Sequence, residues 1–351
     1  MPASDGDTFG IFNVVARRRA ALTTGKMSPR LVDVNRPADS LDWEPALVSA
    51  RFEGLVFDEW VSGNVELVRD LITDHAAVLF TGMSVDTESF GRAVSLVADA
   101  PLADYLNRST PRTRVNGQIF TSTEYSADLA IPMHSEQSYT TNWPLILGFW
   151  CTQPATEGGA TPLARTDRVL EMLPPALVDR FETLGVCYER WYHRHLDLPW
   201  QEVFQTNNRS AVHKMCAATG IDVHWEGELL RTRQVAQATL KHRGRRVWFN
   251  QASLFHPAAL EPSAEEALRL SVGDQLPRNA HYGDLSSISA DDIAEIREAF
   301  SSASWHRPWD IDDVLLIDNL AVAHGRMPFR GERRVLVAMA GSGQSEGKEQ
   351  P

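Results

Sequence analysis

Residues 131–139 read IPMHSEQSY and contain the pair His134-x-Glu136. In an extended strand, residues i and i+2 point to the same face, so we expect the imidazole and the carboxylate to project side by side. They would supply two of the three ligands of a 2-His-1-carboxylate set, which holds non-haem Fe(II) and leaves coordination positions open. The third ligand must come from elsewhere in the chain. The candidate is His324, in the segment NLAVAHG at 319–325.

A second histidine pair with the same spacing, His193-x-His195, is a rival metal site. The carboxylate in register with it is Asp197, and Pro199 follows closely. We interpret the surrounding aromatic-rich region, about 166–245, as an insertion between the two halves of a β core. It would act as a wall or lid over the site that His134 and Glu136 define.

Composition limits the kind of protein. Of 351 residues, 43% are hydrophobic and 23% are charged, which is ordinary for a globular chain. The formal net charge of −12 argues against a nucleic-acid-binding protein, which normally has a basic surface. We find no apolar run of about 18 residues that would indicate a membrane span, and no secretory signal. Three widely spaced cysteines suggest reduced thiols. We therefore expect a soluble cytoplasmic protein.

Strand and turn patterns indicate a mixed α+β chain. Leu145–Thr152 is a continuous apolar run of strand length, and Asn116-Gly117 between β-branched and aromatic residues predicts a hairpin. A final strand is expected within 326–340. No repeat or long linker divides the chain, so we predict one domain over 15–341, with a loose N-terminus at 1–14 and a disordered tail at 342–351.

Two adjacent arginines follow the candidate third ligand. On the last strand, side-chain alternation directs just one of Arg333 and Arg334 inward. A buried guanidinium needs an anionic partner, and it matches a carboxylate in bidentate geometry. A dicarboxylate that binds a metal at one end and arginine at the other satisfies both groups. The alternative is that the arginines form surface ion pairs with Glu332 or Asp312.

Longer stretches of the chain resemble a known family. They include STPRTRV, TSTEYSADLAIPMHSEQSY, PATEGGATPLA, WQEVFQT, VWFNQASLFH and DNLAVAHGRMPFRGERRVLVAMA, in this order along about 15–341. The chain is similar to Fe(II)/2-oxoglutarate-dependent dioxygenases of the taurine dioxygenase superfamily, within the branch typified by the aspartyl hydroxylase of syringomycin biosynthesis. This resemblance implies a double-stranded β-helix, or jelly-roll, core with flanking helices and a large insertion between the strands that bear the metal ligands.

The resemblance also implies roles for individual residues. Arg334 matches the arginine that binds the distal carboxylate of 2-oxoglutarate, and Thr161 matches the threonine that assists it. The metal-binding carboxylate is Glu rather than the Asp of the archetype. Ala338, four residues after Arg334, replaces a second arginine of taurine dioxygenase, which puts taurine-type substrate contacts in doubt. The implied iron ligands are His134, Glu136 and His324.

The implied activity is oxidation of an unactivated C–H bond, with Fe(II), 2-oxoglutarate and O2. Hydroxylation is the expected outcome; desaturation, epoxidation and cyclisation would use the same oxidant. The branch suggests a role in natural-product (antibiotic) biosynthesis, acting on an amino-acid-like small molecule that is free or tethered to a carrier protein. Substrate contacts are expected from Arg112, Thr123, Glu124 and Asn250.

Two alternatives belong to other classes of protein. One is a jelly-roll binding protein without turnover, which would lack a metal ligand or the arginine–threonine pair; all five positions are filled here. The other is a zinc-dependent hydrolase that uses the two histidines and the glutamate with a bound water. A hydrolase does not account for Arg334 or Thr161. Metal analysis of the purified protein would separate the two enzymes.

Overall fold

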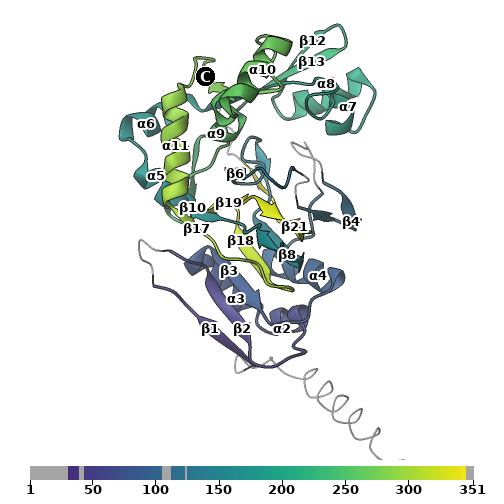
Figure 1. The fold of residues 1–351 in the computed structure, drawn as a ribbon, viewed down its shortest axis with the longest axis vertical. Coiled ribbons are helices and arrows are strands. Elements are labelled where there is room, and N and C mark those ends of the chain that lie inside the picture. The colour runs from purple at the N-terminus through teal and green to yellow at the C-terminus, as the bar shows by residue number, and fades with distance from the viewer. Residues whose placement is uncertain (1–30, 39–42, 105–111, 123–124, 345–351) are drawn as a thin grey trace, which may run out of the picture.

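Two β-sheets lie at the centre of this computed structural model, which describes residues 31–38, 43–104, 112–122 and 125–344 (Figure 1). Neighbouring strands of the larger, eight-stranded sheet are antiparallel except β2 and β3, which are parallel. In spatial order its strands are β1 (Val32–Asn35), β2 (Ala46–Ala50), β3 (Ala77–Thr81), β18 (Val314–Asp318), β8 (Ile146–Gln153), β21 (Arg334–Ala340), β5 (Ile119–Thr121) and β4 (Arg114–Asn116).

The smaller, four-stranded sheet packs against the larger one through a shared core. Phe149 and Val337 of the large sheet belong to one buried cluster with Leu163 and Val322 of the small sheet. Burial of apolar area is the main favourable term in folding, so this cluster holds the two sheets together. In spatial order the small sheet consists of β17 (Ser304–Trp305), β10 (Leu163–Arg165), β19 (Val322–Arg326) and β6 (Ile131–His134).

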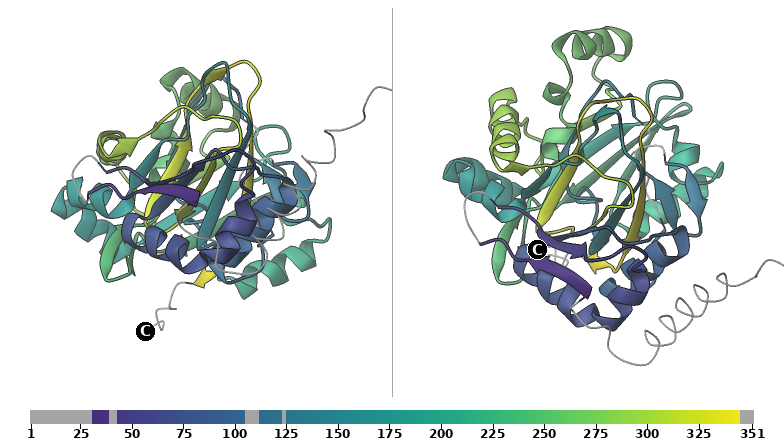
Figure 2. Two further views of the ribbon diagram at one scale, coloured as in Figure 1. Left: turned by 90° about the horizontal axis from the view of Figure 1, so that it is seen from below. Right: turned by 60° about the horizontal axis from the view of Figure 1, so that its bottom comes forward.

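Three helices cover the outer face of the large sheet (Figure 2). They are α2 (Phe57–Gly63), α3 (Val65–His75) and α4 (Thr87–Ala98). The rings of Phe90 on α4 and Trp150 on β8 lie 5.8 Å apart between centroids. Because α4 and the inter-sheet core lie on opposite sides of β8 and β21, both faces of these strands are buried.

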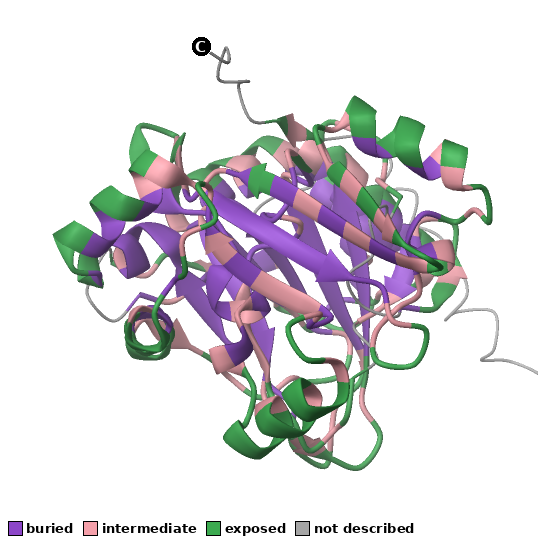
Figure 3. Cartoon of the chain, turned by 90° about the horizontal axis from the view of Figure 1, so that it is seen from above, coloured by how far each residue is buried: buried purple, intermediate pink, exposed green. Residues whose placement is uncertain are grey.

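A third sheet and the remaining helices form the other end of the molecule, where the helices present exposed outer surfaces around buried central strands (Figure 3). The sheet has the order β12 (Asp222–Glu226), β13 (Leu229–Ala236), β11 (Val186–Trp191) and β16 (Arg278–Tyr282). The helices are α5 (Thr166–Met172), α6 (Pro175–Leu184), α7 (Trp200–Val203), α8 (Arg209–Ala218), α9 (Ala252–Phe255), η2 (Pro257–Ala259), α10 (Pro262–Val272) and α11 (Ala290–Ser302). Three two-stranded pairs complete the described elements: β14 (Thr239–His242) with β15 (Arg245–Trp248), β9 (Glu157–Gly158) with β20 (Phe329–Arg330), and β7 (Asn142–Trp143) with β22 (Gly343–Gln344).

Several expectations from the sequence are confirmed. The chain has a mixed helix-and-strand fold, the apolar run at 145–152 forms β8, and the last strand is β21. The hairpin at Asn116-Gly117 joins β4 to β5, with Gly117 at a φ of +52°. In the described part of the chain, no helix is long and apolar enough to cross a membrane.

Two boundaries differ from expectation. The third sheet is not confined to 166–245, because β16 lies beyond that range and pairs with β11 from Val186↔Tyr282 onward. Gly343 and Gln344, expected in a disordered tail, form β22 with backbone pairing to β7. A Cβ on Gly343 would lie 2.3 Å from the indole nitrogen of Trp143, so the close approach needs glycine. The predicted loose N-terminus, 1–14, is outside the described residues.

Candidate metal centre and active site

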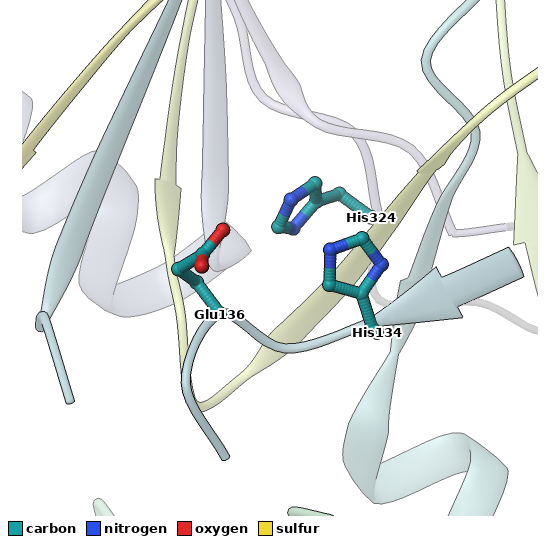
Figure 4. A group of neighbouring side chains, drawn as sticks. All are labelled: His134, Glu136 and His324. Atoms are coloured by element: carbon teal, nitrogen blue, oxygen red, sulfur yellow. The ribbon is translucent and has the colours of Figure 1, made fainter. Parts of the chain in front are cut away.

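Three side chains from two strands and a loop converge at one end of the small sheet. His134 ends β6, Glu136 follows two residues later, and His324 lies on β19 directly opposite His134. Each offers one ligand atom, and these atoms all lie within 4.8 Å of one another (Figure 4). Within the described residues this is the one group of three or more such side chains close enough to hold a metal ion. The structure therefore brings the predicted set together.

The two imidazoles have the protonation state that metal binding requires. Burial lowers the pKa of His134, and it lowers the pKa of His324 well below the usual value, where the charges of His134 and Arg112 add to the effect. Nδ1 of His134 lies 2.9 Å from the carbonyl oxygen of Pro132. A ring that donates from Nδ1 presents an unprotonated Nε2 to a metal. Two neutral imidazoles and a carboxylate fit Fe(II).

Glu136 lies in a loop, and its backbone is held by the side chain of Asn319 and not by strand pairing. The sequence places it on the same strand as His134, but β6 ends at His134. Instead, the buried amide of Asn319 accepts a hydrogen bond from the Glu136 backbone N–H at 2.7 Å and donates to its carbonyl oxygen at 2.9 Å. The same amide donates to the Pro144 carbonyl at 2.8 Å. Asn319 was not predicted; its one signal in the sequence is a polar residue inside the segment that carries His324.

Arg112 faces the metal site from the other sheet. It lies just before β4, and its guanidinium nitrogen Nη2 is 2.6 Å from Oε2 of Glu136. Both side chains are 4% exposed. The sequence predicted Arg112 as a substrate contact; the structure places it beside the metal-binding carboxylate, in the lining of the same pocket.

The structure places Arg333, and not the neighbouring Arg334 that was predicted as the anchor, in the pocket. Arg334 is exposed at the start of β21, whereas Arg333 lines the pocket. Nε of Arg333 donates to the Gly159 carbonyl at 2.8 Å, and its Nη2 lies 3.4 Å from Oγ1 of the buried Thr161. Val335, two residues after Arg333, also lines the pocket. The strand is irregular here: its partner β8 has an extra residue between the positions opposite Arg334 and Val335.

Burial on both faces of β21 explains why the sequence did not show which of the two arginines faces the pocket. Val335 and Val337 pack in the core between the sheets, while Leu336 and Ala338 pack under the helices. Alternating apolar residues therefore fill both faces, so the pattern carries no information on which face is the pocket. If Arg333 is the anchor, the position four residues later, which corresponds to the second arginine of taurine dioxygenase, is Val337 instead of Ala338. Val337 is also apolar.

A third arginine, Arg326, was not predicted and also lines the pocket. It lies on β19 two residues after His324 and is 6% exposed. Its guanidinium donates to the backbone carbonyls of Tyr125 at 3.0 Å, Leu129 at 2.8 Å and Ser126. Burial and then the charge of Arg326 lower the pKa of Arg333 to about 10, so Arg333 is still a cation near neutral pH.

The remaining predicted residues do not join the pocket. Thr123 and Glu124 are outside the described residues. Asn250 is buried, but its amide donates to the Ala238 carbonyl at 2.9 Å and accepts from the Ala252 N–H at 3.0 Å. Both partners are backbone groups, so the amide is satisfied within its own part of the chain. In the rival pair, Nε2 of His193 lies 2.6 Å from the Gln275 carbonyl oxygen.

Comparison with known proteins agrees with this geometry. The profile of the taurine catabolism dioxygenase TauD, TfdA family matches residues 41–339, and the chain belongs to this family. It is 37% identical over 311 residues to the dapdiamide synthesis protein DdaC of Enterobacter agglomerans, an alignment that covers 87% of this chain and 94% of DdaC. It is 27% identical over 298 residues to the clavaminate synthase-like protein At3g21360 of Arabidopsis thaliana, covering 81% and 87% of the two chains.

Solved structures share the fold at low identity. PvcB from Pseudomonas aeruginosa superposes with a TM-score of 0.52 at 15% identity, over 90% of this chain and 92% of PvcB. A second PvcB structure, described as an Fe, alpha-ketoglutarate dependent oxygenase from an isonitrile synthetic pathway, gives a TM-score of 0.51 at 16% identity, over 90% of this chain and 93% of that one. Membership of the family confirms the predicted class: an oxidoreductase of the dioxygenase type with iron and 2-oxoglutarate as its cofactors.

Proposed function

We propose that the protein is an Fe(II)- and 2-oxoglutarate-dependent oxygenase that oxidises an unactivated C–H bond of an amino-acid-like small molecule in a biosynthetic pathway. The observation that carries this proposal is the convergence of His134, Glu136 and His324 beside a pocket with a buried arginine. We further propose that the two central sheets form the double-stranded β-helix of the family, with the metal at its open end. The single-domain organisation over 15–341 and the cytoplasmic location remain predictions.

His134, Glu136 and His324 would hold the iron. When bound, the iron with 2-oxoglutarate and O2 supplies the oxidising equivalent, and 2-oxoglutarate is converted to succinate and CO2. The two imidazoles remain neutral because they are buried, and Asn319 fixes the backbone that carries Glu136. Phe149 packs against the His324 ring at a centroid distance of 4.9 Å and keeps that side of the site apolar.

Arg333 and Thr161 would bind the distal carboxylate of 2-oxoglutarate. The guanidinium is oriented by the Gly159 carbonyl, and the Thr161 hydroxyl accepts a hydrogen bond from the Trp309 indole at 3.0 Å. These contacts fix both groups before a ligand arrives, which lowers the entropy lost on binding. A buried cation beside a neutral hydroxyl and a carbonyl favours an anion. This assignment replaces the Arg334 expected from the sequence.

The chemical outcome that we favour is hydroxylation. Glu136 fills the position that a halide would need, so halogenation is disfavoured; desaturation, epoxidation and cyclisation stay open. The biosynthetic setting is supported by the names of two similar proteins, one assigned to dapdiamide synthesis and one to an isonitrile pathway. The proposed substrate is an amino-acid-like compound, either free or tethered to a carrier protein.

The cofactor assignment is tested by visible absorption under anaerobic conditions, with Fe(II) added first and 2-oxoglutarate second. We expect a weak charge-transfer band that requires both additions and is lost in His324→Ala. His193→Ala is the matched control, because that histidine lies outside the proposed site, and it should give the wild-type band. Normal iron binding without any band would contradict the proposal.

The substrate class is tested by succinate formation in air with a panel of free amino acids and their carrier-bound thioesters. A productive substrate should stimulate succinate formation and gain the mass of one oxygen atom if hydroxylation is the outcome. A mass loss of two hydrogens would instead indicate desaturation or cyclisation. If succinate forms but no amino-acid compound raises its rate, the amino-acid assignment is wrong, while the cofactor assignment stands.

A further inference from the structure

The contact between Arg112 and Glu136 connects the two central sheets across the proposed metal site. Arg112 precedes β4 at the edge of the large sheet, whereas Glu136 follows β6 of the small sheet. Both side chains are 4% exposed, so little solvent screens the pair. A buried ion pair of this kind restricts both partners to one geometry, because breaking it leaves an uncompensated charge.

The position of Arg112 is itself fixed by the hairpin that follows it. The backbone N–H of Thr113 donates to the Thr121 hydroxyl at 2.9 Å, and the Thr121 N–H donates to the Thr113 carbonyl at 2.8 Å. Thr121 in turn lies on β5, opposite Leu336 of β21. The guanidinium is therefore attached through the hairpin to the same strand that Arg333 precedes, and it approaches Glu136 from a rigid support.

The two carboxylate oxygens of Glu136 have different surroundings. Oε2 accepts the hydrogen bond from Arg112, while Oε1 has no hydrogen-bond partner among the described residues. A glutamate has one more rotatable bond than an aspartate, so its carboxylate can turn to present one oxygen or both to a metal. The hydrogen bond from the Arg112 guanidinium to Oε2 opposes rotation of the carboxylate.

We propose that Arg112 is a positioning residue that holds Glu136 as a one-oxygen ligand and so keeps a coordination position open for 2-oxoglutarate. This inference rests on the proposed function, since it assumes a metal held by Glu136 and the two histidines. It assigns to Arg112 a role different from the substrate contact expected from the sequence. Without Arg112 the carboxylate would be free to bind the metal through both oxygens, and it would then take one of the positions that 2-oxoglutarate and O2 need.

The test separates metal binding from co-substrate binding. Co(II) is titrated anaerobically into wild type, Arg112→Gln and Arg112→Lys, and its visible absorption reports the coordination number. 2-Oxoglutarate is then titrated into each Co(II)-loaded protein. For Arg112→Gln we expect Co(II) affinity equal to or tighter than that of wild type, weaker visible bands, and 2-oxoglutarate affinity at least tenfold lower. Arg112→Lys, which keeps a cation, should recover most of that loss.

Arg114→Gln is the matched control. Arg114 lies two residues away in an exposed ion pair with Asp104 at 2.8 Å, and its loss should change neither affinity. If Arg112→Gln does not fold, Glu136→Asp breaks the same pair from the other side by withdrawing the carboxylate one methylene. It should bind Co(II) and lose 2-oxoglutarate affinity to a similar extent.

Two results would overturn the inference. In the first, Arg112→Gln, or Glu136→Asp in its place, binds 2-oxoglutarate as tightly as wild type. In the second, Co(II) and 2-oxoglutarate affinities fall in parallel, which is what a purely structural role for Arg112 would give. Failure of wild type itself to bind Co(II) would refute the proposed metal centre, and that outcome is distinct from both.

Discussion

His134 and His324 on the metal side of the pocket face each other across paired strands, whereas Arg333 on the anion side lies just before an irregular stretch of β21. The metal side uses side chains that are unusual in buried strands, so their identity alone indicates the site. The anion side uses an arginine with an arginine neighbour, and the choice between them depends on which face of the strand is the pocket. The metal ligands can thus be predicted from residue type alone. The choice between Arg333 and Arg334 cannot, because the sequence does not show which face of the strand lines the pocket.

Loss of a metal ligand should have the largest effect and tests the metal side. We expect His324→Ala to lower Fe(II) or Mn(II) affinity more than about 100-fold, beyond the range of about 10- to 100-fold typical of residues that only orient a ligand. Calorimetric titration with Mn(II) measures this. His195→Ala, in the rival histidine pair, should bind Mn(II) like wild type; a large loss in that variant would move the metal site to the other pair.

Asn319→Ala should weaken the metal side indirectly. The amide makes three hydrogen bonds to buried backbone groups, so we expect a loss of about 3 kcal/mol in the free energy of unfolding and about tenfold in Mn(II) affinity. Urea unfolding and Mn(II) titration measure the two effects. Asn64→Ala removes another buried amide, one that donates to the Trp60 carbonyl, and should cost stability without changing Mn(II) affinity. Unchanged Mn(II) affinity in Asn319→Ala would mean that Glu136 needs no backbone support.

Gly159→Ala perturbs the anion side alone. A Cβ at this position would lie 2.9 Å from Cδ of Arg333, so the guanidinium must shift. We expect 2-oxoglutarate affinity to fall about threefold, or about 0.6 kcal/mol, with Mn(II) affinity unchanged. Gly227→Ala is the matched control because it has a similar positive φ, +59° against +69°, and nothing within 4 Å of the added atom. Equal losses in both variants would attribute the effect to backbone strain.

A buried carboxyl away from the metal ligands gives an effect on stability that depends on pH. Burial raises the pKa of Asp313 to about 6, above its value of about 3.9 in an unfolded chain. The folded state therefore binds the proton more tightly, and the stabilisation present at low pH is lost as pH rises through 6. Between pH 5 and pH 8, wild type should lose about 1 kcal/mol of unfolding free energy relative to Asp313→Asn. A difference that is constant with pH would contradict the raised pKa.

The residues that sequence analysis missed share a physical feature. Asn319 and Arg326 act through contacts with backbone atoms of distant segments, at Glu136 and at Tyr125–Leu129. A sequence pattern does not show which distant backbone groups a side chain will hydrogen-bond. Asn250 shows the converse: it was expected to line the cavity, but it is not among the residues that line the pocket, and local backbone groups satisfy its amide. Strands, the hairpin and the metal ligands were predictable because their signals are local or chemically rare.

A comparison of the two adjacent arginines tests which of them binds the co-substrate. Arg333→Gln and Arg334→Gln are each loaded with Mn(II), and the dissociation constant for 2-oxoglutarate is determined by calorimetric titration. We predict at least a tenfold weaker constant for Arg333→Gln and one within twofold of wild type for Arg334→Gln. The reverse order would show that the exposed arginine binds the co-substrate, and it would contradict the assignment of the anion side.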